Sequence, residues 1–171
     1  MKKPVLILAP MAGFTDAPFR LLARRCGADF AVTEMVSSVA TVYKDKKTAA
    51  LAKLPSGDTP TAIQLFGHDP KIMAKAAEML ASGYYTGNVS QVAPAAIDVN
   101  MGCPVKKIAG SGDGSALMSS PALCGDIVAA MKEALDPYGI PVTVKIRAGA
   151  DTAHMNAPQV AKICADAGAA A

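Results

Sequence analysis

The feature that most constrains the fold of this chain is a regular alternation between short apolar runs and longer segments whose apolar residues have helical spacing. Such alternation is typical of βα units, in which each strand is followed by a helix and the strands lie parallel in one sheet. The sequence therefore predicts an α/β fold. The predicted strands are Val5–Ala9, Phe30–Glu34, Thr61–Phe66, Ala96–Asn100 and Pro141–Ile146.

The segments between these runs carry signals for helix starts, most often an N-cap residue followed by proline in the first turn. Composition favours helices packed closely on a sheet, because 34 of the 171 residues are alanine and only 5% are aromatic. The segment 83–94 is irregular and predicts no element. The predicted helices are Phe19–Cys26 behind Asp16-Ala17-Pro18, Ser38–Lys53, a helix from Asp69-Pro70 to Ser82, one from Ser120-Pro121 to Leu135, and a last one from Asn156-Ala157-Pro158 to about Gly168.

Two architectures fit five consecutive βα units. An open doubly wound sheet suits a length of 171 residues, whereas a complete (β/α)8 barrel needs about 250. The sequence gives no sign of a reversal in strand order, which favours the first part of a barrel. We therefore expect a partial (β/α)8 TIM barrel of about five βα units, truncated before strand six, with the open doubly wound sheet as the alternative.

Charge and cysteine content narrow the function classes. The formal net charge of +3 is too small to indicate nucleic-acid binding by composition, although it allows a local basic patch. The cysteines have neither C-x-x-C spacing nor a nearby histidine, so we expect no metal site, no disulfide framework and a cytoplasmic location. No run approaches the roughly 18 apolar residues of a membrane span, so no membrane partner is expected. Cys26, Cys124 and Cys164 lie in apolar helical patterns and are expected in the core.

Polar and conformationally special residues follow the predicted strands, at the end where ligands bind in both architectures. The sequence contains no G-x-G-x-x-G after its first strand and no G-x-x-x-x-G-K-[ST] motif, which argues against dinucleotide-binding and P-loop functions. The strand-end segments are Ala9-Pro10-Met11-Ala12-Gly13-Phe14-Thr15-Asp16, Thr33-Glu34-Met35-Val36, Gln64-Leu65-Phe66-Gly67, Asn100-Met101-Gly102-Cys103-Pro104-Val105 and Val144-Lys145-Ile146-Arg147.

Together and in this order, the five segments resemble the motifs of the tRNA-dihydrouridine synthases, a family of FMN-dependent (β/α)8 enzymes. The resemblance spans essentially the whole chain and is most specific at Asn100-Met101-Gly102-Cys103-Pro104. It implies that residues 1–171 are the amino-terminal portion of a flavin-binding TIM-barrel domain, without the C-terminal strands and the helical tRNA-binding domain of the family. It also implies the reduction of the C5–C6 double bond of uridine in tRNA, with NAD(P)H as electron donor.

This reaction needs a hydride at C6 of the base and a proton at C5 from the opposite face. A cysteine with an ordinary pKa of about 8.5 is mostly protonated at neutral pH and can donate that proton. Gly102 and Pro104 flank Cys103, allowing close approach of a ligand and stiffening the loop. The resemblance implies that Cys103 is the catalytic acid.

The resemblance also assigns cofactor and substrate contacts. Lys145 would place an ammonium group near the flavin and stabilise its anionic reduced form. Asn100 and Arg147 are the expected substrate-binding residues, through the base edge or a phosphate. The residues expected to bind FMN are Pro10, Met11, Ala12, Gln64 and Lys145.

Other charged and ionisable residues leave their roles open. Glu34 either orients a neighbouring group or pairs with Arg147. His68 and His154 lie in no matching motif and are not expected to be catalytic. A set of basic residues could form a phosphate-contacting rim, although such runs are more often solvated faces: Arg24, Arg25, Lys44, Lys46, Lys47, Lys106 and Lys107.

Two other functions remain as alternatives. One is another FMN-dependent TIM-barrel oxidoreductase, similar to dihydroorotate dehydrogenase, which also places a cysteine near a flavin. The other is a non-catalytic partial barrel that binds RNA or a partner. The Lys106-Lys107 pair and the match at all five strand ends favour the synthase.

Overall fold

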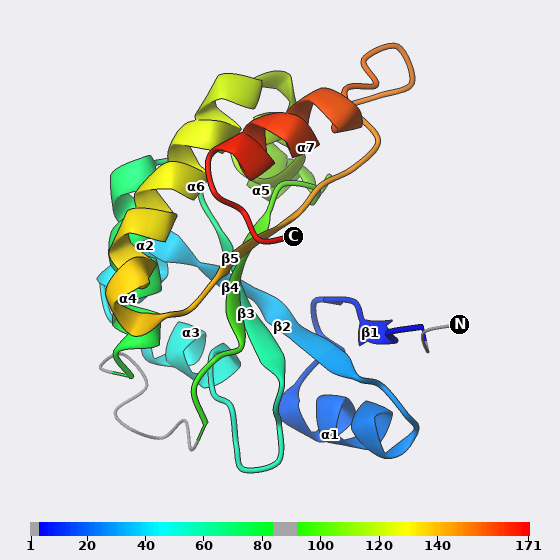
Figure 1. The fold of residues 1–171 in the computed structure, drawn as a ribbon, viewed down its shortest axis with the longest axis vertical. Helices are drawn as coiled ribbons and strands as arrows, with labels where there is room; N and C mark the ends of the chain where they lie inside the picture. Colours follow the sequence, from blue (N-terminus) through cyan, green and yellow to red (C-terminus); the bar gives the residue numbers. More distant parts are fainter. Residues whose placement is uncertain (1–3, 84–91) are drawn as a thin grey trace.

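The computed structural model describes residues 4–83 and 92–171, which form a parallel sheet of five strands with helices packed against it (Figure 1). The strands are β1 Ile7–Leu8, β2 Phe30–Ser37, β3 Thr61–Phe66, β4 Ala96–Asn100 and β5 Val142–Lys145. The α-helices are α1 Ala17–Arg25, α2 Ser38–Val42, α3 Lys46–Leu51, α4 Pro70–Ala81, α5 Lys106–Ala109, α6 Pro121–Leu135 and α7 Ala157–Asp166. Two 3-10 helices, η1 Gly114–Ser119 and η2 Asp136–Tyr138, complete the described elements.

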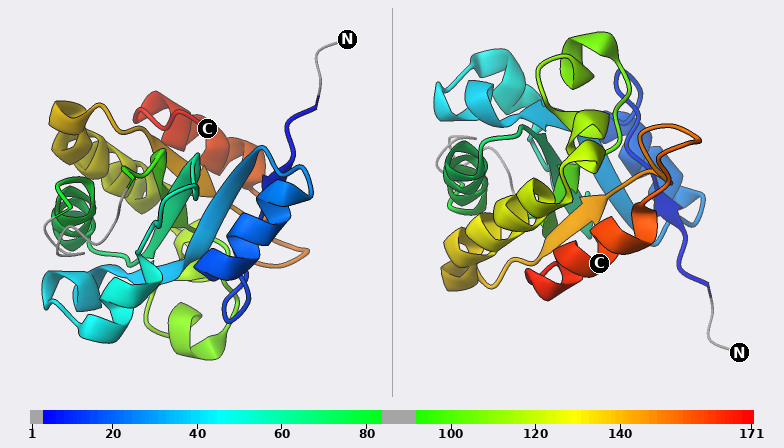
Figure 2. Two further views of the ribbon diagram at one scale, coloured as in Figure 1. Left: turned by 90° about the horizontal axis from the view of Figure 1, so that it is seen from below. Right: turned by 90° about the horizontal axis from the view of Figure 1, so that it is seen from above.

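The sheet is curled, and the helices lie around its outer face as in one side of a barrel (Figure 2). Its strands follow one another in the order β1-β2-β3-β4-β5, and every pair is parallel. A doubly wound sheet would reverse this order part way and carry helices on both faces. The prediction of a partial (β/α)8 barrel with five βα units is therefore confirmed, and the open doubly wound sheet is wrong.

Strand alternation divides the apolar residues into two clusters. The larger core lies between the sheet and the helices, and it includes Ile63 of β3 and Val99 of β4. Helix α6 lies at the centre of this layer, in contact with both α4 and α7. The smaller cluster, Val32, Ala62 and Ala96, lies on the concave face. Its small side chains leave room on the concave face for the polar residues described below.

Aspartate caps followed by proline begin α1 and α4, as predicted. Asp16 accepts a hydrogen bond from the Phe19 amide at 3.0 Å, and Asp69 accepts one from the Ile72 amide at 3.0 Å. The last helix differs, because Asn156 makes no side-chain cap. Its Nδ2 instead donates to the Met118 carbonyl at 2.7 Å, which ties the start of α7 to η1.

The single helix predicted over Ser38–Lys53 is wrong, because the chain forms two short helices there, α2 and α3. Between them, Lys44 has a φ of +59°, in the left-handed region that commonly ends helices. Asp45 then caps α3 by accepting a hydrogen bond from the Thr48 amide at 2.8 Å.

The central strands β3 and β4 occupy the predicted residues, whereas the outer ones differ. The first strand is shorter than the predicted Val5–Ala9, because β1 pairs only with β2 in the part of the chain described. The second is longer than predicted and continues past Glu34 to Ser37, with a register shift between Val32 and Met35. Helix α5 and the two 3-10 helices were not predicted.

The last residues of the chain lie along β5. The Ala170 amide donates to the Val142 carbonyl at 2.8 Å, and the Val144 amide donates to the Ala171 carbonyl at 3.0 Å. These residues therefore occupy the side of β5 where the next strand of a barrel would lie. Most of the segment 83–94, for which the sequence predicted no element, lies outside the described residues.

Candidate functional site

A cavity of about 220 Å³ opens where the carboxyl ends of the strands meet. Six of the eight site residues predicted from the sequence line it, and Met35 of β2, which was not predicted, does so too. Met11 and Arg147 are the two predicted residues outside it. The lining residues are Pro10, Ala12, Met35, Gln64, Asn100, Gly102, Cys103, Pro104 and Lys145.

The register of the central strands explains why these side chains meet. Gln64 of β3 lies beside Asp98 of β4, and Asp98 lies beside Thr143 of β5. Because alternate residues share a face, these three form a polar row on the concave side of the sheet. Two residues further along, Asn100 lies beside Lys145 at the strand ends. The cavity is thus lined by Gln64 from the first row and by Asn100 and Lys145 from the second.

Asp98 is a buried carboxylate in the first of these rows, with 6% of its surface exposed. Its Oδ2 accepts a hydrogen bond from Gln64 Nε2 at 2.7 Å, and its Oδ1 accepts one from Thr143 Oγ1 at 2.6 Å. Burial raises the pKa of Asp98, and the two hydrogen bonds and the charge of Lys145 offset only part of that rise. A buried carboxylate needs such partners, since an unpaired buried charge is costly.

The hydrogen-bond chain continues from Gln64 to the cysteine loop. Gln64 Oε1 accepts a hydrogen bond from Asn100 Nδ2 at 2.9 Å. Asn100 Oδ1 in turn accepts from the backbone amides of Gly102, at 3.1 Å, and Cys103, at 2.9 Å. The Asn100 oxygen is therefore occupied twice by the loop, and of its two amide hydrogens only the one not directed at Gln64 is left to reach a ligand.

Cys103 is half-buried at the edge of the cavity, and its loop is fixed from a second side. Its carbonyl accepts a hydrogen bond from the Ser115 amide at 2.9 Å. Gly114 packs so closely that a Cβ there would lie 2.7 Å from the Cys103 carbonyl oxygen, and its φ is +58°. The first residues of η1 therefore support the cysteine loop, and Gly114 has no room for a side chain.

The loop after β1 forms the opposite wall through Pro10 and Ala12. The Met11 amide donates to Thr15 Oγ1 at 3.1 Å, which closes the loop, while the Met11 side chain is 41% exposed and does not line the cavity. The Gly13 amide donates to Glu34 Oε2. Glu34 thus orients a neighbouring loop, the first of the two roles considered for it.

Arg147 and Lys145 lie at the end of β5 and are both exposed. Arg147 Nη1 donates to the Gly102 carbonyl at 3.1 Å, so this side chain braces the cysteine loop from outside the cavity. Lys145 lines the cavity.

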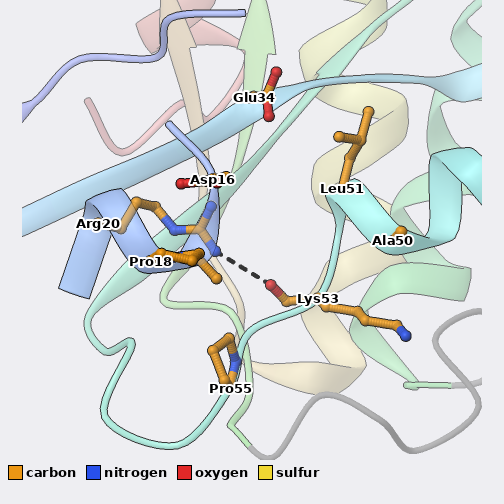
Figure 3. A pocket seen from close by; sticks show the side chains of 9 residues that line it. Asp16, Pro18, Arg20, Glu34, Ala50, Leu51, Lys53 and Pro55 are labelled. Atoms are coloured by element: carbon orange, nitrogen blue, oxygen red, sulfur yellow. Dashed lines mark hydrogen bonds between the residues drawn. The ribbon is translucent and has the colours of Figure 1, made fainter. Parts of the chain in front are cut away.

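A second cavity, of about 470 Å³, lies at the same end of the sheet between α1, α3 and β2 (Figure 3). Arg20 forms its floor, and its guanidinium donates to the Lys53 carbonyl at 3.2 Å and to Asp58 Oδ2. Glu34 lies above it, and Leu51 of α3 lies across from it (Figure 3). None of the residues predicted for the site lines this cavity.

The remaining cysteines are not all in the core. Cys124 and Cys164 are buried as predicted, and burial raises the pKa of both thiols, that of Cys124 to about 12. Cys26 is exposed, which corrects the prediction for it. It follows the last residue of α1, whose outer side is not covered by another described element.

The histidines and the basic residues considered for a phosphate-contacting rim lie outside the cavity. His68 pairs with Asp113 at 2.8 Å. Arg24, placed among the rim residues from the sequence, instead points inward, and its Nη2 donates to Thr61 Oγ1 at 2.6 Å. Lys106 and Lys107 are exposed on α5, directly after the cysteine loop. The described residues contain no group of three or more potential metal ligands, and none of their helices is long and apolar enough to cross a bilayer.

Besides Met35, sequence reasoning missed two polar residues next to the cavity, Asp98 and Thr143. A signal for them was present, because both are polar residues within strands that are otherwise apolar, and buried polar groups need partners. The sequence did not fix which residue each would meet, since that depends on the register of strands far apart in the chain.

Comparison with known proteins connects this geometry to a family. A family model described as "Dihydrouridine synthase (Dus)" matches residues 7–171. The chain is 44% identical over 164 residues to "tRNA-dihydrouridine synthase B" of Pseudomonas putida, covering 95% of this chain and 45% of that protein. It is 41% identical over 168 residues to the protein of that name from Xanthomonas campestris, covering 98% and 47%. A "Probable tRNA-dihydrouridine synthase" of Treponema pallidum is 40% identical over 168 residues, covering 97% and 47%. The chain therefore spans about half the length of the curated relatives that it matches.

Proposed function

Since the chain belongs to the dihydrouridine synthase family, we propose that it forms the flavin-contacting and proton-donating part of a cytoplasmic enzyme that reduces uridine in tRNA. The observation that supports this most strongly is the meeting of Cys103, Asn100, Gln64 and Lys145 around one cavity at the carboxyl ends of the strands. In barrel enzymes the reacting groups lie at this end. We also propose that the chain is the amino-terminal portion of the barrel domain, because it spans about half the length of its relatives.

The lining of the cavity fits the ring system of FMN. Pro10 and Ala12 offer a wall without bulky polar groups, which suits a flat ring. Lys145 and the amide nitrogen of Gln64 are hydrogen-bond donors, and they would meet the carbonyl and nitrogen acceptors at one edge of the flavin. The volume of about 220 Å³ lies below the roughly 300 Å³ of the smallest complete ligand pockets, so this set of residues would hold the ring and not the whole cofactor.

The chemistry that FMN supplies when bound is the transfer of a hydride, taken from NAD(P)H, to C6 of uridine. Cys103 donates its thiol proton to C5, and the C5–C6 double bond becomes a single bond. The resulting Cys103 thiolate takes a proton from water, which its half-buried position at the cavity edge allows. Lys145 stabilises negative charge on the reduced cofactor. The Asn100 amide hydrogen that does not face Gln64 offers a donor to a base carbonyl, and Lys106 and Lys107 offer charge to nearby phosphates.

The target base must leave its stack before Cys103 can reach C5, at a cost of a few kcal/mol. Contacts elsewhere on the tRNA have to offset this cost. The part of the relatives' length that this chain does not span is where we expect those contacts, together with the groups that hold the phosphate of FMN.

The test joins this chain to the remaining part of the Pseudomonas putida relative and compares Cys103→Ala with Cys26→Ala, a cysteine that is exposed and distant from the cavity. We expect Cys103→Ala to lose dihydrouridine formation by about 10²-fold or more, the range typical of a lost general acid, while NADPH still reduces the flavin. Cys26→Ala should resemble the parent in both assays. Dihydrouridine formation by Cys103→Ala at the parental rate would show that another group is the acid. Absence of flavin binding by the parent protein would instead favour a non-catalytic partial barrel.

A further inference from the structure

Asp98 is the buried charged group of the site for which the mechanism above has no use. It lies on β4, the middle strand of the polar row, two residues before Asn100, and only 6% of its surface is exposed. It touches neither the cysteine loop nor the cavity that Cys103 lines. The path from it to Cys103 runs through two amide side chains, Gln64 and Asn100.

We propose that Asp98 is a positioning residue, whose carboxylate sets the direction of the Gln64–Asn100 amide chain and thereby holds the Cys103 loop in place. The role rests on the proposed function, since the position of Cys103 matters for catalysis only if Cys103 is the proton donor.

The direction of the amide chain follows from which of its atoms can donate and which can accept hydrogen bonds. An ionised carboxylate accepts hydrogen bonds and cannot donate them, so only the Gln64 nitrogen can face Asp98. The Gln64 oxygen is then turned to the Asn100 nitrogen, and the Asn100 oxygen is turned to the amides of Gly102 and Cys103. With each step the orientation of one amide determines the next. Reversing the chain would place the Asn100 nitrogen against two backbone N–H groups, and the amides of Gly102 and Cys103 would lose the acceptor that they share.

Thr143 completes the arrangement without being part of the chain. Its hydroxyl donates to the Asp98 oxygen that faces away from Gln64. Both carboxylate oxygens are therefore occupied by donors, which fixes the rotation of the Asp98 side chain. Because the hydroxyl can also accept, Thr143 imposes no direction of its own.

The accessibility of the Cys103 thiol reports this restraint without any cofactor or tRNA. Alkylation rates at each cysteine can be followed peptide by peptide by mass spectrometry. Exposed Cys26 serves as an internal reference for the reagent, and buried Cys124 and Cys164 report whether the fold is intact. Because the thiolate is the species that reacts, rates are compared at their high-pH limit, and a change in that limit confined to Cys103 reports the loop.

We expect Asp98→Leu, which removes the acceptor at similar size, to raise the Cys103 rate about tenfold, as for the loss of a charge-assisted hydrogen bond. Asp98→Asn keeps an oxygen that can accept from Gln64, but its nitrogen also allows the amide chain to form in the reversed direction. We therefore expect the alkylation rate of Cys103 to rise about threefold. In the double variant Asp98→Asn with Gln64→Glu, the carboxylate that can only accept hydrogen bonds stands at residue 64 instead of residue 98. Asn100 must then again donate its N–H to residue 64. The Cys103 rate of this double variant should return to within about twofold of the parent.

The control is Thr143→Val, which removes a hydrogen bond from the same carboxylate but leaves the amide chain, and it should change the Cys103 rate by less than about twofold. A role in filling space alone predicts equal rates for Asp98→Asn and the double variant, because all these side chains have nearly the same size, and equal rates would overturn the proposal. If Asp98→Leu also exposes Cys124 and Cys164, the comparison between Asp98→Asn and the double variant decides. The result is separable from the proposed function, which is tested by flavin binding of the parent protein and by dihydrouridine formation in Cys103→Ala.

Discussion

Replacing Asp58 by asparagine should cost this fold about 3 kcal/mol, the low end of the range for removing one charge from a buried ion pair. Asp58 is fully buried between α1 and the start of β3. Its Oδ2 accepts hydrogen bonds from Arg20 Nε at 2.9 Å and Nη2 at 2.5 Å, and its Oδ1 accepts one from Thr61 Oγ1 at 2.9 Å. Asparagine keeps one acceptor for Arg20 and turns its nitrogen to the Thr61 hydroxyl. What it loses is the charge, which leaves a buried guanidinium without its counterion.

The consequence reaches the site through Arg20, whose Nη1 also donates to the Thr15 carbonyl at 2.6 Å. Thr15 closes the loop that carries Pro10 and Ala12, so the ion pair fixes the cavity wall opposite Cys103. Figure 3 shows the Arg20 guanidinium directed toward Lys53, among the residues that line the neighbouring cavity. Asp58→Asn should therefore loosen the wall of the flavin cavity as well as lower the stability of the fold.

The assay is urea unfolding followed by circular dichroism. With a slope of about 2 kcal/mol per molar urea, a loss of about 3 kcal/mol lowers the midpoint by about 1.5 M. The matched control is Asp166→Asn, which breaks an exposed pair with Lys162 at 2.9 Å and should leave the midpoint nearly unchanged. The deficit of Asp58→Asn should persist in 1 M salt, since buried pairs are little screened. Equal midpoints for the two variants would refute the assignment of Asp58 and Arg20 as a stabilising buried pair.

Two further predictions concern the cysteine loop and the polar row. Gly114→Ala should destabilise the fold by about 2 kcal/mol or more and speed alkylation of Cys103, because it combines a left-handed backbone with a Cβ 2.7 Å from the Cys103 carbonyl oxygen. The control is Gly139→Ala, where φ is +63° and no atom lies within 4 Å of the added Cβ, so that only the backbone cost applies. Equal losses of stability for the two variants would contradict the predicted clash. Burial raises the pKa of Asp98 in the folded chain above its value in the unfolded chain. Between these two pKa values the folded chain binds more protons than the unfolded chain, so the free energy of unfolding falls as pH rises. The stability of the parent minus that of Asp98→Asn should therefore decrease from about pH 4 upward in urea titrations, and a difference independent of pH would contradict the raised pKa.

The sequence was sufficient for the central part of the fold because its signals there are local. Thr61–Phe66 and Ala96–Asn100 are short apolar runs bounded by turn residues, and both strands occupy those residues. Asp16 and Asp69 mark helix starts through contacts within three residues of each cap. The five strand ends could be aligned because consecutive parallel strands present their carboxyl ends at one edge.

Features that depend on neighbours in space were harder to predict. The extent of β1 is set by its pairing with β2, so the apolar run from Val5 did not fix its length. Helical spacing continues on both sides of Lys44, and the break there follows from a backbone conformation that spacing does not reveal. Asp45 was the available signal, as an N-cap inside the predicted helix. Cys26 was misplaced for a similar reason, because its apolar surroundings in the sequence are not covered in the fold.

The polar row shows where a stronger sequence argument was available. Gln64 and Asp98 each interrupt an apolar strand, and a buried amide or carboxylate without a partner costs several kcal/mol. Assigning Gln64 to a ligand alone left Asp98 unexplained. Since adjacent parallel strands align their residues, two such interruptions on neighbouring strands are each other's most economical partners, and the observed register pairs them. The same reasoning makes Asn100 first a support of the Cys103 loop and only then a contact for a base, because its oxygen is already occupied by two backbone amides.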